Sequence, residues 1–288
     1  MNKKINFVVL LIFTSILMFS CNSNNSGNAE GAESISTNED SLNSHKMSDN
    51  QENKDNSSIE EDSYDQTFYP SEFENKSILV VPNTEFHGDG KDEIEAKKEW
   101  LGLFKTKSGF YLKNVKATIQ TVYDPISDNE DGPFTGVKVV PSINHSCELL
   151  LNPIGGMKEQ KLLSFQTKEK TMFAGDKINF KCNEINYQVY CTGIQKSRDE
   201  TAEIKEYKLM ISSDKYAQGQ QLLMQVPPSN DYTSNRISVY LIALIDNDDI
   251  PDVILKLNNE NFFLYLSSSA KEGEIVAPTG REVLFGGC

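Results

Sequence analysis

The chain has 288 residues and a formal net charge of −14, with 42 Asp and Glu against 28 Lys and Arg. This acidic balance argues against nucleic-acid binding, which calls for a basic face. The length is sufficient for one large domain or two small ones with a core that buries most of its surface.

Residues 1–20 have the organisation of a secretory signal. Lys3 and Lys4 precede an almost wholly apolar run from Ile5 to Phe19. A charged start followed by a short apolar stretch is typical of export signals. The run is too short for an ordinary membrane-spanning helix, which needs about 20 residues. We therefore expect residues 1–20 to be a signal peptide.

The apolar run ends in Leu-Met-Phe-Ser directly before Cys21. This segment resembles the lipobox of bacterial lipoproteins, whose cysteine receives a diacylglyceryl group and becomes the first mature residue. The resemblance implies that Cys21 is the lipid attachment site and anchors the protein to a lipid bilayer. Asn22 rather than Asp follows the cysteine, which by resemblance to sorted lipoproteins favours the outer membrane of the cell envelope. The alternative is cleavage elsewhere, with Cys21 in a disulfide.

Residues 21–66 are expected to form a lipidated, disordered acidic tether. Positions 22–66 contain ten Ser and nine Asn, and eleven acidic residues face only Lys46 and Lys54, which gives a net charge of −9. Low hydrophobicity with high net charge cannot bury enough surface to fold. As a flexible coil, such a segment has an end-to-end distance of about 35–40 Å.

Residues 67–288 are expected to form a β-rich globular body, either as one unit or as two subdomains that divide near residue 170. Many short apolar or alternating runs separated by turns are typical of antiparallel sheets in a sandwich, a barrel or a stack. One short helix is expected over 92–100, with Glu early and Lys late, and Ser108-Gly109 marks a hairpin. The expected strands are 77–82, 101–105, 110–112, 115–123, 136–140, 147–151, 178–182, 187–191, 207–212, 221–226, 239–245, 252–257 and 262–267.

With Cys21 lipidated, Cys147, Cys182, Cys191 and Cys288 remain, an even number that implies disulfides in an exported chain. Proximity in sequence favours Cys182–Cys191, which would leave Cys147–Cys288. A tight turn over residues 183–186 would oppose the local pair, because Cys191 would then lie about 13 Å along the strand from the partner of Cys182. Four cysteines allow three connectivities, and Cys182–Cys191 with Cys147–Cys288 is the one we favour.

Catalytic motifs are sparse. The sequence has no GxSxG elbow, no phosphate-binding loop and no dinucleotide fingerprint. His87-Gly88-Asp89-Gly90 can place an imidazole beside a carboxylate, but Gly-Asp-Gly is also an ordinary turn. An envelope hydrolase that acts on glycans or peptides through carboxylates is therefore the alternative function. The leading hypothesis is a non-catalytic binding or structural domain with an unknown envelope ligand or protein as its partner.

The segment 241–257 carries two hydrophobic runs around an Asp-rich loop, residues 246–252. It resembles the strand–loop–strand of FG-GAP or VCBS-type repeats, whose alternating carboxylates hold calcium. The resemblance implies a weak calcium site at Asp246, Asp248 and Asp252, with Leu244 at the first ligand position. The alternative is a turn without metal, in which Asx side chains hydrogen-bond the local backbone. In both cases we expect the three carboxylates to point toward a common centre.

The last third of the chain, from Glu206, is also similar to a group of uncharacterised bacterial proteins. They share the strand pattern, the Asp loop, a run like LYLSSSAKEGEIV over 264–276, and a terminal Gly-Cys, here Gly287-Cys288. This resemblance implies kinship but brings no known activity.

Overall fold

The computed structural model describes residues 68–71, 77–88, 91–95, 99–129, 131–143, 146–195, 197–198, 204–216, 219–227, 236–258 and 261–282. All of them belong to one compact unit, Glu60–Cys288. The expected signal peptide, Cys21 and the tether up to residue 66 lie outside the described residues. Within the described segments, no helix has the length and apolar character that a membrane crossing requires.

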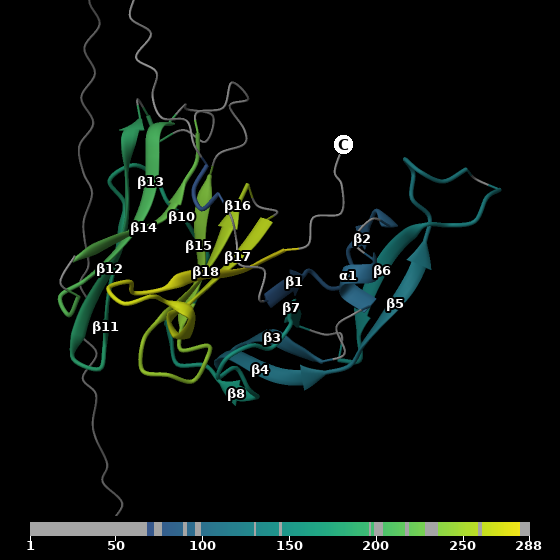
Figure 1. Cartoon of the computed structure of the whole chain (residues 1–288), viewed down its shortest axis with the longest axis horizontal. Coiled ribbons are helices and arrows are strands. Elements are labelled where there is room, and N and C mark those ends of the chain that lie inside the picture. The colour runs from purple at the N-terminus through teal and green to yellow at the C-terminus, as the bar shows by residue number, and fades with distance from the viewer. Residues whose placement is uncertain are drawn as a thin grey trace, which may run out of the picture. The chain divides into compact units, whose positions relative to one another are not determined.

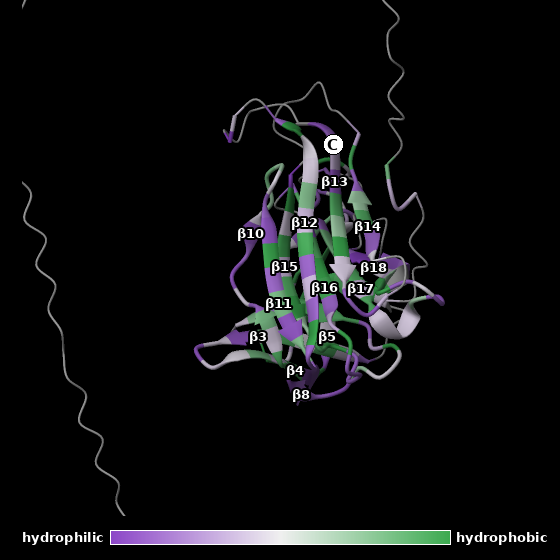
Figure 2. Ribbon diagram, turned by 90° about the vertical axis from the view of Figure 1, so that its left-hand side faces the viewer, coloured by the Kyte–Doolittle hydropathy of each residue, from purple (hydrophilic) through white to green (hydrophobic). Residues whose placement is uncertain are grey.

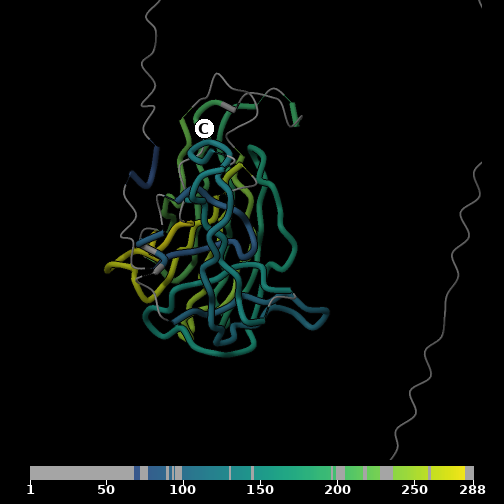
Figure 3. Tube along the Cα trace, turned by 90° about the vertical axis from the view of Figure 1, so that its right-hand side faces the viewer, coloured from purple at the N-terminus to yellow at the C-terminus, as the bar shows by residue number. Residues whose placement is uncertain are grey.

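The body is mostly β, as predicted, and its strands form three sheets (Figure 1). Every ladder is antiparallel except the pairing of β1 with β18. The segments of these two strands run side by side in Figure 3, although they come from opposite ends of the described chain. The largest sheet has the order β10 (Lys170–Thr171), β15 (Ile237–Ala243), β16 (Asp252–Leu257), β17 (Asn261–Leu266), β18 (Ala277–Glu282), β1 (Ser77–Val80), β7 (Cys147–Leu151), β3 (Trp100–Thr106), β4 (Gly109–Val115) and β8 (Gln160–Lys161), with β9 (Ser164–Gln166) also paired to β15.

Two smaller sheets complete the fold. The four-stranded sheet has the order β11 (Lys177–Cys182), β12 (Ile185–Gln195), β13 (Ile204–Ser213) and β14 (Gln220–Gln225). The three-stranded sheet has the order β2 (Glu85–Phe86), β6 (Gly136–Pro141) and β5 (Ala117–Val122). The described helices are α1 (Lys91–Glu95) and the 3-10 helix η2 (Ser267–Ser269).

The hydrophobic core consists of three clusters in series. The first lies between the four-stranded sheet and one face of β15, β16 and β17. The second lies on the opposite face of the same strands and packs against β1, β3, β4 and β7. The third covers the other face of β1, β3 and β7 with the three-stranded sheet and α1. Strand β16 illustrates the consequence of period-2 geometry: Val253 and Leu255 enter the first cluster, whereas Ile254 enters the second.

Every strand expected from the sequence corresponds to a strand of the structure, with ends that differ by a few residues. Of the expected helix over 92–100, the structure describes α1 over Lys91–Glu95, and residues 96–98 lie outside the described part. Trp100 at the expected helix end instead begins β3, where its indole is 4% exposed and packs in the third core cluster. The residue near which two subdomains were expected to divide, Lys170, begins β10, and β10 pairs with β15 in the largest sheet.

Candidate functional site

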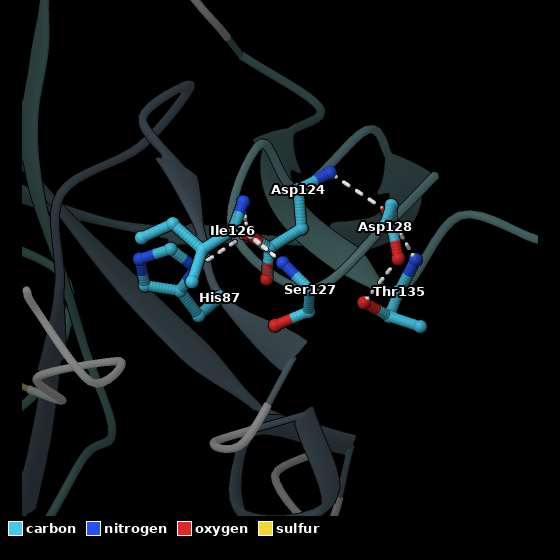
Figure 4. A network of polar contacts seen from close by, with 6 residues as sticks. All are labelled: His87, Asp124, Ile126, Ser127, Asp128 and Thr135. Carbon is cyan, nitrogen blue, oxygen red and sulfur yellow. Dashed lines mark hydrogen bonds and ion pairs between the residues drawn. The ribbon is translucent and has the colours of Figure 1, made fainter. Parts of the chain in front are cut away.

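The connection from β5 to β6, residues 123–135, forms a polar cluster with the residue that follows β2; residue 130 is outside the described part. We call this connection the β5–β6 loop. Phe86 at the end of β2 and Thr121 near the end of β5 both pair with Val137 of β6, from opposite sides. His87 and the start of the loop therefore lie at the same end of the three-stranded sheet (Figure 4).

Asp124 is the centre of this cluster and is 2% exposed. Its Oδ1 lies 2.7 Å from Nδ1 of His87 and accepts hydrogen bonds from the backbone N–H groups of Ile126 (3.0 Å) and Ser127 (3.4 Å). Burial alone would raise the pKa of Asp124, but the hydrogen bond from His87 and those from the backbone lower the pKa from 3.8 to about 2. Asp124 is therefore an anion at neutral pH. Its Oδ2 is buried and has no hydrogen-bond partner among the described residues.

Asp128 closes the loop on itself. Its Oδ2 accepts hydrogen bonds from the N–H groups of Asp124 and Thr135, each at 2.8 Å, and its Oδ1 accepts one from the Thr135 hydroxyl at 2.7 Å. The Asp128 N–H in turn donates to the Asp124 carbonyl at 2.9 Å. Burial opposes ionisation of Asp128, but these bonds hold its pKa below 3.8. The two carboxylates thus fix both ends of the loop.

Gly88 makes the approach of β2 to the loop possible. A Cβ at this position would stand 2.5 Å from the carbonyl oxygen of Thr135, too close for any side chain. Together with the contact of His87 with Asp124, this packing joins the two segments at both ends of the cluster.

The loop presents apolar groups to solvent while its polar groups are engaged internally. Of the six large hydrophobic side chains that are exposed in the described part of the chain, three belong to it: Tyr123 (40%), Phe134 (48%) and Ile126 (58%). The rings of Tyr123 and Phe134 meet edge to face at 5.6 Å between centroids. We call these three side chains the apolar patch.

His87 and Asp124 are arranged like the general base and its orienting carboxylate in hydrolytic triads. Nδ1 of His87 contacts Asp124, and Nε2 is the nitrogen that would act on a nucleophile. A nucleophile is also needed. Among the described hydroxyl and thiol groups, none hydrogen-bonds Nε2 of His87. The arrangement orients an imidazole, and the residues around it form a rigid, partly apolar surface.

The sequence offered Asp89 as a carboxylate beside His87 and favoured an ordinary turn over residues 88–90; Asp89 lies outside the described residues. The partner is Asp124, 37 residues away in sequence. The sequence does contain a signal for an ordered turn around Asp124. Asp124, Asp128 and Thr135 are short polar residues of a type that hydrogen-bonds the local backbone and so favours ordered turns. No local pattern connects this loop to His87, since the connection runs through the register of β6.

The Asp loop, residues 246–252, is a hydrogen-bonded turn. Asp252 accepts from the N–H groups of Ile245 (2.6 Å), Asp246 (3.2 Å) and Ser267 (2.8 Å). Asp246 accepts from the N–H of Ser268 at 3.1 Å. The three carboxylates do gather at a common centre, and that centre is η2.

Both carboxylate oxygens of Asp248 also accept hydrogen bonds. Oδ2 accepts one from the Ser267 hydroxyl at 2.7 Å, and Oδ1 accepts one from the backbone N–H of Ile250 at 2.8 Å. In the described part of the chain no group of three or more His, Cys, Asp or Glu side chains is arranged to hold a metal ion. The geometry therefore corresponds to the turn alternative and gives no support to calcium at Asp246, Asp248 and Asp252.

Among the described residues, the carboxyl groups with raised pKa values are Asp248 and Asp252 of this turn. Burial first, and then the charge of Asp246, raise the pKa of Asp252 well above 3.8. Burial also raises the pKa of Asp248, with a further contribution from Asp246. Asp252 is fully buried, and its oxygens accept internal hydrogen bonds. A hydrolase would need such carboxyl groups to face substrate, so this pair does not support the hydrolytic alternative.

The described cysteines are free: Cys147 is half-buried, whereas Cys182 and Cys191 are buried. The expected Cys182–Cys191 bridge is not formed, because Asn183 and Glu184 alone make the turn between β11 and β12 and Cys182 pairs with Ile185. Cys191 is six residues further along β12, a separation of about 20 Å. Cys288, the expected partner of Cys147, lies outside the described residues, as does Cys21.

Comparison of the chain with protein-family models, with curated proteins and with solved structures found no match.

Proposed function

We propose that this chain is a lipid-anchored envelope protein whose β-rich body binds another envelope protein without catalysis, through the apolar patch of the β5–β6 loop. The observation that carries the proposal is that Tyr123, Ile126 and Phe134, each at least 40% exposed, lie on one loop, with the rings of Tyr123 and Phe134 in contact. Aromatic residues are enriched at the centres of protein interfaces and supply much of their binding energy.

The hydrogen bonds beneath the patch support this assignment. Binding costs free energy when a loop must be ordered at the same time. Asp124 and Asp128 accept bonds from both ends of the loop, which lowers that cost. Anchoring is inferred from the export signal and Cys21 in the sequence. The lead function stays binding because, among the described residues, no hydroxyl or thiol group hydrogen-bonds Nε2 of His87.

Site-specific photocrosslinking in cells tests the proposal. A photoreactive phenylalanine analogue at position 134 keeps an aromatic ring in the patch, and the same analogue at position 194 provides a matched control. Ile194 is 61% exposed but lies on β12, outside the loop. We expect ultraviolet light to join the position-134 protein to a defined envelope protein, with no such adduct from position 194.

Disruption of the patch sharpens the test. The paired substitution Tyr123→Ser and Ile126→Ser should abolish the adduct from position 134, because it removes the other two exposed apolar side chains of the loop. The hydrogen bonds that Asp124 accepts from Ile126 and Ser127 use backbone N–H groups, so they remain. Equal adducts from positions 134 and 194, or an adduct that survives the paired substitution, would contradict the proposed interface.

A further inference from the structure

The outward face of the four-stranded sheet carries a row of polar side chains that the β5–β6 loop does not involve. Ladder register places Asn179 of β11 opposite Gln188 of β12, Gln188 opposite Ser212 of β13, and Ser212 opposite Gln220 of β14. Their neighbours in sequence, such as Ile178 and Val189, enter the core. In Figure 2 hydrophilic and hydrophobic segments accordingly alternate along β12.

This row forms part of an open pocket of about 610 Å³. Its lining includes Asn179, Gln188 and Ser212 from the row, with Asn186 and Asp214 at one side. The pocket therefore lies across β11, β12 and β13, and its lining also includes Tyr187 and Phe180, which belong to or pack against the first hydrophobic cluster.

The polar groups of the lining are oriented by one another. The Gln188 side-chain amide donates to Oδ1 of Asn179 at 2.6 Å, which leaves the Asn179 amide N–H groups and the Gln188 carbonyl oxygen for a ligand. Asn186 donates to Asp214 through its backbone N–H (3.2 Å) and its side-chain amide (2.8 Å). The lining thus offers both donors and acceptors in fixed positions.

Charge in the lining is nearly balanced. Asp214 supplies one negative charge and Lys181, which also lines the pocket, one positive charge. Lys181 is in addition paired with Glu184. An anionic ligand such as nucleic acid needs a basic site, and this lining does not supply one.

We propose that this pocket binds a neutral oligosaccharide. Sugar hydroxyl groups both donate and accept, which matches the paired amides of Asn179 and Gln188 and the hydroxyl of Ser212. The site lies on the face of the sheet, whereas an extended peptide would add at a sheet edge, where backbone groups are unpaired. The proposal is independent of the β5–β6 loop, which belongs to another sheet.

Isothermal titration of the full chain with chitotetraose and with maltotetraose, in separate experiments, tests this inference. We expect millimolar or tighter binding of at least one of them. The double substitution Asn179→Ala and Gln188→Ala should weaken it about tenfold or more, since it removes several hydrogen bonds. Lys208→Ala is the matched control, because Lys208 is exposed on β13 outside the pocket and its removal should leave affinity unchanged.

Thermal melting of each variant tests whether the fold is intact. A second substitution, Ser212→Leu, should block the floor of the pocket independently. Absence of binding by both saccharides at millimolar concentration would overturn the proposal. So would affinity that the double substitution leaves unchanged, or binding of a synthetic peptide of residues 22–45 in place of the saccharides.

Discussion

Two buried aspartates show how surroundings decide the chemistry of one residue type. Asp124 and Asp252 both accept hydrogen bonds from backbone N–H groups. The pKa of Asp124 falls to about 2, because the hydrogen bonds from His87 and the backbone outweigh burial. The pKa of Asp252 rises, because burial is complete and Asp246 and Asp248 add like charge. Asp124 thus holds its loop as an anion, whereas Asp252 lies in a turn that ionisation destabilises.

Asp124→Asn tests the first of these roles. The folded pKa of about 2 lies below the unfolded value of 3.8, so ionised Asp124 stabilises the fold above pH 3.8, and this contribution is lost as the pH falls toward 2. The substitution should lower the melting temperature by a few degrees at pH 7 and reduce the loss of stability between pH 3.8 and 2.

Thermal melts across this pH range measure both effects. Asp131→Asn is the matched control, because Asp131 is an exposed acid of the same loop. Identical acid transitions in the two variants would show that Asp124 does not hold the loop by charge.

The cysteines give a second prediction at the residue scale. Burial raises the pKa of the Cys191 thiol to about 12 and also raises that of Cys182, so both thiols are protonated and unreactive at neutral pH. Iodoacetamide without reductant should leave both unlabelled in the folded protein and label both in urea. Protection that persists in urea and disappears only after reduction would instead establish a disulfide.

At the scale of elements, strands with apolar residues at period 2 were predictable because their burial is periodic. Strand β18 (Ala277–Glu282) was not, since Pro278, Thr279 and Gly280 are typical of turns. It fits in the sheet because β1 approaches closely: a Cβ on Gly280 would lie 2.7 Å from the carbonyl oxygen of Ser77. The partner that makes a strand of this segment is about 200 residues away in sequence.

The candidate site was predictable to a smaller extent, for a related reason. The clustering of acids at 246–252 was visible in the sequence, but the N–H groups that offset them come partly from η2. The pairing of Asn179, Gln188 and Ser212 depends on the register of three strands. Local patterns predict elements, whereas sites formed between elements require the register.

The junction between the Asp loop and residues 154–157 yields a prediction for an element contact. A Cβ on Gly156 would lie 1.9 Å from the carbonyl oxygen of Asp246, and backbone cannot yield as a flexible side chain does. Gly156→Ala should therefore lower the free energy of unfolding by about 1–3 kcal/mol, the usual cost of overpacking. Urea unfolding measures it.

Gly132→Ala is the matched control for Gly156→Ala, because its Cβ would meet the nearest atom, the carbonyl oxygen of Asn129, at 3.4 Å. Equal stability of the two variants would mean that the segment 154–157 does not press against the Asp loop in solution.

At the scale of the whole molecule, the sequence divides into an acidic segment, 22–66, with a net charge of −9, and a body with −7. The two areas proposed for recognition lie on different sheets, the apolar patch beside the three-stranded sheet and the pocket on the four-stranded sheet. The expected tether would favour such a plan, since it would separate the body from lipid headgroups while the expected anchor keeps the local concentration of binding sites high.

Lipid attachment at Cys21 is the prediction on which this plan depends. Two or three acyl chains bury enough methylene groups, at roughly 0.8 kcal/mol each, for stable membrane association. Mass spectrometry of the native N-terminal peptide should therefore find an acylated Cys21, and Cys21→Ser should move the protein from the membrane fraction to the soluble fraction or leave its signal uncleaved. Cys147→Ser, which alters a free thiol of the body, should stay in the membrane fraction. A mature terminus at another residue would refute the anchor while leaving the binding sites of the body to be tested on their own.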